Sequence, residues 1–265
     1  AMAAKASKIR LDQLLLSRGL ADSRTKAQAL IMAGAVFSGT KRLDKPGHQV
    51  KDDIALELKG RAHPWVSRGG LKLTHGLDHF QIDPKGLTCL DVGASTGGFS
   101  DVLLSRGAAR VYALDVGYGQ LADKLRRDDR VINMERTNAR YLSPEDIPDP
   151  IDLIVCDASF IGLEILLPAS LSLARPGARL VSLIKPQFEV GKGLVGKGGV
   201  VRDPDLHGEV CERIEAWLGG VPGWTVLGIT ESPITGPQGN KEFLIAANLN
   251  DNPQRPRLRA AAPAA

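Results

Sequence analysis

Cysteine and long apolar runs are both scarce in this chain of 265 residues. The three cysteines lie far apart, and none has the CxxC spacing that is typical of a metal or redox site. We therefore expect buried, reduced thiols, no bound metal and a cytoplasmic location. No uncharged apolar run reaches the length of about 18 residues that a membrane-spanning helix needs. Residues 1–10 also lack the apolar segment of a secretory signal, so we expect neither a membrane span nor export.

A strong net charge and an abundance of aromatic side chains are also missing. The chain has 34 basic and 30 acidic residues, a net charge of +4, and only 5% aromatics. The balance is uneven, because residues 1–64 hold 12 basic and 6 acidic side chains, whereas residues 65–250 hold 19 and 23. We expect the basic N-terminal part to attract a polyanion, and the acidic part as a whole not to do so. Since few aromatics are present to stack on bases, phosphate contacts should dominate such binding.

The first 60 residues contain the pattern of a small α+β domain. The leucines within 11–15 share one helical face, and Gly19 ends that helix. Ser23 is a typical N-cap for a second helix, which Gly34 ends. Short strands are predicted at 36–37 and 54–58.

From about residue 65 the pattern changes to short apolar runs that alternate with helical stretches. Such alternation predicts a mainly parallel sheet covered by helices on both faces, in a Rossmann-like α/β fold. The seven predicted strands are 88–92, 110–114, 131–134, 151–156, 179–184, 225–229 and 243–247. The predicted organisation is an α+β domain over 8–60, a linker over 61–66, an α/β domain over 67–249 and a disordered tail over 250–265.

A glycine-rich turn, GASTGGF over residues 93–99, follows the first predicted strand of the larger domain. It is neither the GxGxxG of dinucleotide sites nor the GxxxxGK[ST] of phosphate loops. The next strand leads to Asp115, whose carboxylate can accept hydrogen bonds from both ribose hydroxyls of an adenosine. The pattern indicates an S-adenosylmethionine site, with a plain tight turn or an NAD site as alternatives. The residues assigned to the cofactor are Asp91, Gly93, Ala94, Ser95, Thr96, Gly97, Gly98, Phe99 and Asp115.

Several longer motifs match one family. They read VSRGGLKL (66–73), DVGASTGGF (91–99), DVGYGQ (115–120), RTNAR (136–140), KPQFEVG (185–191) and GVVRDP (199–204). Together they resemble the TlyA family of hemolysin A-like ribosomal RNA 2′-O-methyltransferases, over about residues 8–248. The motifs RLD (10–12), GL (19–20) and SR (23–24) resemble the RNA-binding module of ribosomal small-subunit protein S-four. The larger domain resembles the FtsJ-type methyltransferases.

The resemblance implies a catalytic tetrad of Lys72, Asp157, Lys185 and Glu242, with S-adenosylmethionine as cofactor. It also assigns Val116, Asn138 and Asp157 to cofactor binding. The reaction that it implies is methylation of a ribose 2′-hydroxyl, of a cytidine, in small- or large-subunit ribosomal RNA. In some members of the family this methylation affects sensitivity to capreomycin-like drugs.

The residue types of the tetrad suit this chemistry. A ribose hydroxyl is a weak nucleophile, so it needs deprotonation or close alignment before it attacks a methyl group. We expect Lys185 to act as the base, with the charge of Lys72 lowering its pKa. Asp157 and Glu242 would orient the two amines, although their charges oppose that shift.

Other functions stay open as alternatives. Amine methylation is disfavoured because residues 157–160 read DASF rather than [DN]PP[YF], and Cys156 would point away from a base at that strand end. A non-catalytic RNA-binding assembly factor and a pore-forming hemolysin are the remaining classes, and the lack of a spanning segment argues against the second. We expect a monomer whose partner is ribosomal RNA or a ribosomal subunit. The residues assigned to RNA are Lys8, Arg10, Arg18, Arg24, Lys26, Lys41, Arg42 and Arg68.

Overall fold

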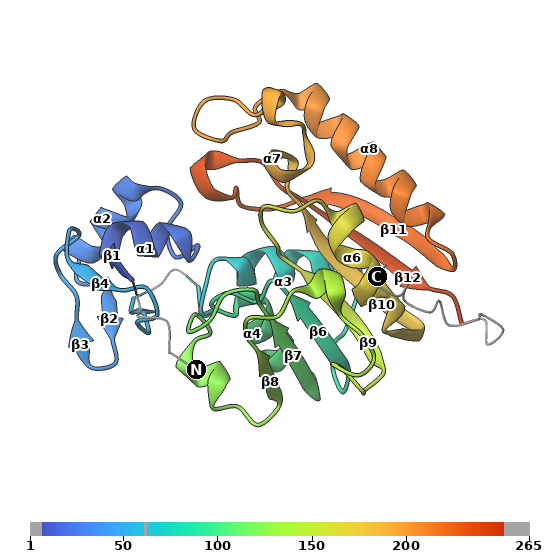
Figure 1. Ribbon diagram of the computed structural model, residues 1–265, viewed down its shortest axis with the longest axis horizontal. Coiled ribbons are helices and arrows are strands. Elements are labelled where there is room, and N and C mark those ends of the chain that lie inside the picture. The colour runs from blue at the N-terminus through green and yellow to red at the C-terminus, as the bar shows by residue number, and fades with distance from the viewer. Residues whose placement is uncertain (1–6, 61–62, 252–265) are drawn as a thin grey trace, which may run out of the picture.

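The computed structural model describes residues 7–60 and 63–251, and its N-terminal part is a small α+β unit (Figure 1). Its two helices, α1 (Leu11–Ser17) and α2 (Arg24–Met32), pack against each other, as predicted. One small sheet pairs β1 (Lys8–Arg10) with β4 (Gln49–Lys51). The other has the order β3 (Lys41–Arg42), β2 (Val36–Ser38), β5 (Glu57–Leu58).

The core of this unit forms where the leucine face of α1 meets α2. Leu11, Leu15 and Ile31 are fully buried in one cluster, and each burial contributes about 2 kcal/mol. Ser23 caps α2 by accepting a hydrogen bond from the backbone N–H of Lys26 at 3.2 Å, as predicted. The helix cap and the apolar face that the sequence predicts for this unit are therefore both found in the structure.

The strand predicted over 54–58 is wrong in its first half, since only Glu57–Leu58 pairs with β2. The guanidinium of Arg18 donates to the carbonyl oxygens of Asp52 and Ile54, each at 2.5 Å. Because a buried side chain takes these acceptors, the segment forms a turn, in which the N–H of Ile54 donates to Lys51 O at 3.1 Å.

The larger unit is built on one seven-stranded sheet. Its strand order is β11 (Trp224–Glu231), β12 (Phe243–Leu249), β10 (Ala174–Ile184), β9 (Ile151–Cys156), β6 (Thr88–Val92), β7 (Arg110–Leu114) and β8 (Val131–Met134). Neighbouring strands are parallel except where β12 pairs antiparallel with β10 and β11. The predicted mainly parallel, Rossmann-like sheet is confirmed.

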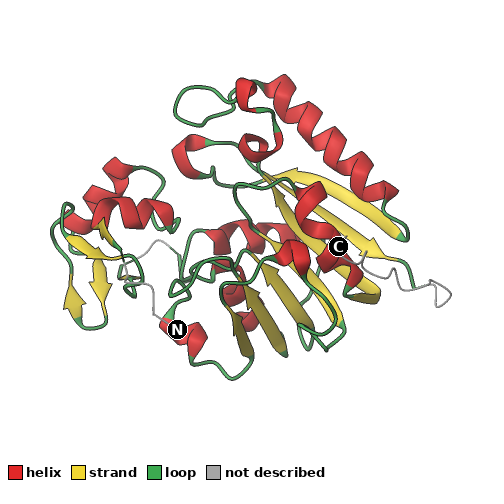
Figure 2. Ribbon diagram, in the orientation of Figure 1, coloured by secondary structure: helices red, strands yellow, loops and turns green. Residues whose placement is uncertain are grey.

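Helices cover both faces of this sheet (Figure 2). Strand residues alternate between the two apolar clusters, with Leu90 and Val92 in one and Cys89 in the other. One cluster is shared with α3 (Gly69–His79), α4 (Gly98–Ser105) and α5 (Asp123–Arg126), the other with α6 (Leu163–Ser172) and α8 (Pro204–Gly220). The short helices in the connections are η1 (Ala139–Tyr141), α7 (Pro186–Glu189), η2 (Lys192–Leu194) and η3 (Pro237–Gly239).

The two units touch at the carboxyl-terminal edge of the large sheet. The hydroxyl of Thr96 donates to the carbonyl of Arg18 at 3.5 Å, and the N–H of Gln238 donates to the carbonyl of Asp22 at 3.1 Å. Of the predicted linker over 61–66, residues 61–62 lie outside the described residues, as does the predicted tail beyond residue 251. Within the described ranges, none of the helices combines the length and apolar character that crossing a bilayer demands.

Candidate active site

A cleft lies between the N-terminal unit and the carboxyl-terminal ends of the strands β6, β9 and β10. About 760 Å³ of empty space lies between its walls, and this volume includes space that is open to solvent. Residues 16–19 and Ala21 of the N-terminal unit form one wall. The start of α3 and the glycine-rich turn form the opposite side. Both units are therefore needed to complete the cleft.

Two ion pairs bring the four predicted catalytic residues together. Lys72 on α3 donates to both carboxylate oxygens of Glu242, at 2.9 and 3.0 Å. Lys185 follows β10, and its Nζ lies 2.5 Å from Oδ1 of Asp157, which follows β9. Lys72, Asp157 and Lys185 line the cleft, whereas Glu242 is 1% exposed and anchors Lys72. Three of the four are thus placed where a substrate can reach them.

The charges of the two pairs influence each other. Burial alone would raise the pKa of Asp157, but the ammonium groups of Lys185 and Lys72 lower it overall. Burial alone would lower the pKa of Lys185, but the carboxylates of Asp157 and Glu242 raise it overall. The expected lowering of the Lys185 pKa is therefore not found, because the two carboxylates outweigh burial. Lys185 is an ammonium at neutral pH in the free protein.

The glycine-rich turn between β6 and α4 packs directly on the strand end that carries Asp157. Gly93 has a φ of +79°, and a Cβ at this position would lie 2.5 Å from the carbonyl oxygen of Asp157. Only glycine fits there, since a side chain would strain the backbone and push Asp157 away. Gly93, Ala94, Ser95, Gly98 and Phe99 all line the cleft, as their assignment requires.

A smaller hollow adjoins the cleft across this turn, because Ala94 and Ser95 line both. Asp115, at the end of β7, lines the hollow, and its carboxylate accepts hydrogen bonds from the N–H groups of Ser95 and Gly117, each at 2.8 Å. A carboxylate after the second strand of the fold and a glycine-rich backbone after the first are the groups that bind the ribose and the rest of a nucleoside-type ligand in such folds. The residues present therefore fit S-adenosylmethionine.

Asp91 does not lie in the cofactor cleft, to which the sequence analysis assigned it. It is fully buried and lines neither hollow, and its Oδ2 accepts the hydroxyl proton of Ser100 at 2.7 Å. Burial raises its pKa to about 7, against the hydrogen bond from Ser100 and with help from the charges of Asp157 and Asp115. Asp91 thus stabilises the first turn of α4 through its hydrogen bond with Ser100, and its side chain does not line the cleft.

Four other residues assigned to the cofactor also line neither hollow. Asn138 accepts a hydrogen bond from the N–H of Arg140 at 3.1 Å and so caps η1. The side chain of Thr96 turns toward the N-terminal unit, where it donates to Arg18. The residues of this group are Thr96, Gly97, Val116 and Asn138.

The predicted basic surface is partly occupied by internal contacts. The buried carboxylate of Asp12 binds Arg10 at 2.9 Å and Arg24 at 3.0 Å. Arg18 is 4% exposed and holds two backbone carbonyls, so its assignment to RNA phosphates is wrong. Its guanidinium is a structural group in the core of the unit.

The other five basic residues differ in exposure, since the side chain of Lys26 is 67% exposed and that of Arg68 is 22% exposed. Lys26 and Arg68 both pair with Asp22. The three that form no ion pair within the described part of the chain are Lys8, Lys41 and Arg42.

Three polar residues at the site escaped the sequence analysis. The Ser159 hydroxyl accepts a hydrogen bond from Lys185 at 3.3 Å, and its place two residues after Asp157 is the signal that could have identified it. Gln120 accepts a hydrogen bond from Ser95 at 3.4 Å beside the smaller hollow. Asp22 has no local signal, because its contacts cross from one unit to the other.

Comparisons with known proteins agree with this geometry. Residues 65–249 match the family described as FtsJ-like methyltransferase, and residues 9–53 match the S4 domain. The 16S/23S rRNA (cytidine-2′-O)-methyltransferase TlyA of Mycobacterium tuberculosis is 49% identical over 91% of this chain and 90% of its own. Hemolysin A of Brachyspira hyodysenteriae is 40% identical over 89% and 98%. The solved structure of a candidate hemolysin from Streptococcus thermophilus is 42% identical, with a TM-score of 0.79 over 94% of this chain and 91% of that one.

Proposed function

The chain belongs to the FtsJ-like methyltransferase family, and on that premise we propose that it methylates a ribose 2′-hydroxyl of ribosomal RNA with S-adenosylmethionine. The resemblance to the TlyA family is confirmed by relatives that match most of the chain. The name of the mycobacterial relative supports a cytidine in 16S and 23S rRNA as the target. The match to the S4 domain supports RNA binding by the N-terminal unit.

One observation carries the proposal: an ammonium and two further tetrad charges line one cleft beside a glycine-rich turn that suits the cofactor. The residues that would hold S-adenosylmethionine are Asp115 and the residues of the turn that line the two hollows, which are Gly93, Ala94, Ser95, Gly98 and Phe99. The chemistry that this cofactor supplies when bound is a methyl group on a sulfonium sulfur. The protein has to hold the hydroxyl oxygen in line with that methyl group and remove the hydroxyl proton.

We assign the two tasks to the Lys185–Asp157 pair. The charged amine of Lys185 donates a hydrogen bond to the 2′-oxygen and so fixes its position, with help from Ser159. The carboxylate of Asp157 accepts the hydroxyl proton, which becomes strongly acidic as the new C–O bond forms and the bond between methyl carbon and sulfur breaks. Lys72, held by Glu242, keeps Asp157 ionised until that moment.

The test is transfer of a labelled methyl group from S-adenosylmethionine to purified ribosomal subunits, followed by mapping of ribose methylation. We expect label in rRNA with the native protein and none above background with Lys185→Ala. Lys85→Ala is the control, since Lys85 is exposed and lies before β6, away from the cleft. Undiminished transfer by Lys185→Ala, with its folding intact, would remove the assignment.

A non-catalytic RNA-binding factor would bind subunits without transferring label in the same assay. Direct pore formation would be measured as dye leakage from liposomes treated with the purified protein, and we expect none.

A further inference from the structure

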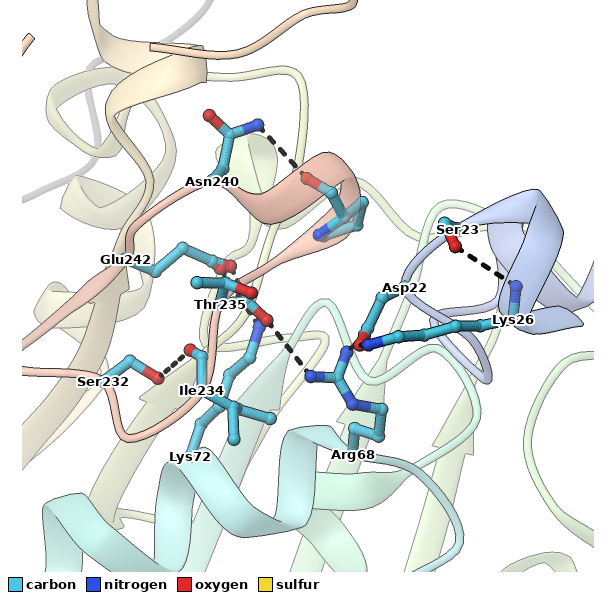
Figure 3. Close-up of polar contacts among 11 residues, drawn as sticks. Asp22, Ser23, Lys26, Arg68, Lys72, Ser232, Ile234, Thr235, Asn240 and Glu242 are labelled. Atoms are coloured by element: carbon cyan, nitrogen blue, oxygen red, sulfur yellow. Dashed lines mark hydrogen bonds and ion pairs between the residues drawn. The ribbon is translucent and has the colours of Figure 1, made fainter. Parts of the chain in front are cut away.

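Asp22, in the loop between α1 and α2, joins the N-terminal unit to the large unit by two contacts, and Figure 3 shows the one with Arg68. Its carboxylate binds Lys26 at 2.9 Å within its own unit and binds Arg68 of the large unit. Its backbone carbonyl accepts a hydrogen bond from the N–H of Gln238 at 3.1 Å. A single residue therefore contacts the large unit at two points, 170 residues apart in the sequence.

The first point is the start of the helix that carries Lys72. Arg68 is the residue before α3, and Lys72 lies on the first turns of that helix. The Arg68 side chain is 22% exposed and that of Asp22 is 17% exposed, so water screens this pair less than it screens a surface pair. Asp22 thus fixes the end of α3 from which Lys72 projects.

The second point is the connection between β11 and β12, residues 232–242, which we call the 232–242 loop. Arg68 also donates to the carbonyl oxygen of Thr235 at 3.3 Å, so the guanidinium lies between Asp22 and this loop (Figure 3). Burial lowers the pKa of Arg68, and the negative charge of Glu242 opposes this shift. Arg68 therefore connects Asp22 to the loop that ends in Glu242.

The 232–242 loop is packed tightly on the Glu242 side chain. A Cβ at Gly236 would lie 2.6 Å from Oε1 of Glu242, so the backbone there touches the carboxylate. The N–H of Ser232 donates to the carbonyl of Glu242 at 2.9 Å, and the N–H of Gly236 donates to that of Asn240 at 2.8 Å. A shift of this loop would move Glu242, which is the partner of Lys72.

We propose that Asp22 is a positioning residue through which the N-terminal unit sets the Lys72–Glu242 pair, by way of Arg68 and the 232–242 loop. The proposal rests on the proposed function, because it concerns the same tetrad. It also links the tetrad to bound RNA, since Lys26 occupies the other side of the Asp22 carboxylate. A phosphodiester that draws Lys26 away leaves the carboxylate to Arg68 alone and tightens the contact with the large unit.

Asp22→Ala is the variant that tests this coupling, and Asp44→Ala is its matched control. Asp44 is an exposed carboxylate of the same unit and forms no ion pair within the described ranges. We expect Asp22→Ala to lower kcat about tenfold, the effect of a charge-assisted hydrogen bond, while KM for ribosomal subunits changes less than about twofold. Asp44→Ala should leave both constants unchanged. Asp22→Asn, which keeps the shape and loses the charge, should fall between Asp22→Ala and the native protein.

Hydrogen–deuterium exchange of the 232–242 loop supplies a measurement that does not depend on catalysis. We expect the Gln238 amide to exchange faster in Asp22→Ala than in the native protein. Adding rRNA should slow the exchange of this loop in the native protein and in Asp44→Ala, but not in Asp22→Ala. A residue that only stabilises the fold of its own unit would not abolish an RNA-dependent change in the 232–242 loop.

The outcomes separate the two proposals. If the native protein transfers no methyl group to subunits, the proposed function fails, and the exchange data alone decide the coupling. If Asp22→Ala matches the native protein in kcat and in loop exchange, the coupling is overturned. In a double-mutant cycle, the Asp22→Ala/Arg68→Ala variant should lose no more kcat than either single variant. If the two single losses of kcat multiply in the double variant, the coupling is also overturned.

Discussion

Lys185 and Asp157 meet at the ends of two neighbouring parallel strands, with Nζ 2.5 Å from Oδ1. Because β9 and β10 run in the same direction, their carboxyl ends emerge side by side and bring the two charges together. The contact keeps the amine protonated and the carboxylate ionised in the free protein. The pair can therefore hold a hydroxyl group, with one partner donating and the other accepting.

The pH dependence of methyl transfer follows from this contact. We expect the rate of the chemical step to stay level between about pH 7 and pH 9, since the pKa of Lys185 is raised and that of Asp157 is lowered. Single-turnover kinetics on ribosomal subunits measure this rate at each pH. A rate that rises about tenfold per pH unit over this range would show that neutral Lys185 is the base, against the roles assigned above.

Gly93→Ala should damage the site more than the fold. The new methyl group would meet the Asp157 carbonyl in a backbone conformation with φ of +79°, at a cost of about 1–3 kcal/mol in folding free energy. We expect methyl transfer to fall at least about tenfold, because a small misplacement of Asp157 disturbs alignment. Gly208→Ala is the control: its Cβ meets nothing within 4 Å in helix α8, so stability should rise by about 0.5–1 kcal/mol with activity unchanged. Equal activity of the two variants would contradict the contact.

Charge reversal at Lys41 and Arg42 tests the RNA surface. Both residues are exposed on β3 and form no ion pair within residues 7–60 and 63–251. We expect the Lys41→Glu/Arg42→Glu variant to bind rRNA about tenfold more weakly, with the slope of log affinity against log salt reduced by about 2. Affinity for S-adenosylmethionine, measured by calorimetry, should not change. Lys85→Glu, at the far end of the sheet, should bind RNA as the native protein does.

Asp91→Asn should change how stability depends on pH. Burial raises the pKa of Asp91 to about 7, above its value of about 3.9 in the unfolded chain. The contribution of the neutral Asp91 carboxyl group to the free energy of unfolding is therefore fully present at acid pH and is lost as the pH rises through about 7. An amide does not titrate, so the stability of Asp91→Asn relative to the native protein should increase by about 2 kcal/mol between pH 5 and pH 8. Urea unfolding at both values measures this change.

A control separates this effect from general charge effects. Glu145 is exposed, so Glu145→Gln should show nearly the same difference from the native protein at both pH values. If the difference for Asp91→Asn is equally flat, Asp91 is ionised throughout and its raised pKa is contradicted.

The sequence was sufficient to predict the large unit because its signals are local. Each strand of the sheet is an apolar run, and the glycines of the turn over 93–99 predict a sharp bend after β6. Asp157 and Lys185 directly follow strands, so the parallel topology alone places them at one edge. The strand predicted over 54–58 failed because a distant side chain, Arg18, competes for its carbonyl groups.

The roles of individual charges were harder to predict. Arg18 and Arg24 look like any exposed basic residue in the sequence, but one holds backbone carbonyls and the other a buried carboxylate. The state of Lys185 depends on the number of carboxylates within reach, and spacing along the chain does not reveal that number. Each of these contacts joins residues that lie 12 or more positions apart in the sequence, so it becomes visible only in the folded chain.

The position of β12, between the edge strand β11 and β10, has a consequence for biosynthesis. This strand lies between β10 and β11, and Glu242 immediately precedes it. While a ribosome is still making the chain, everything up to residue 241 can emerge with β10 and β11 unpaired along their inner edges. The N-terminal unit has its own core and can fold first. Lys72 therefore cannot pair with Glu242 until almost the whole described chain has been synthesised. On the proposed function, a nascent chain would be able to bind RNA well before it is able to methylate it.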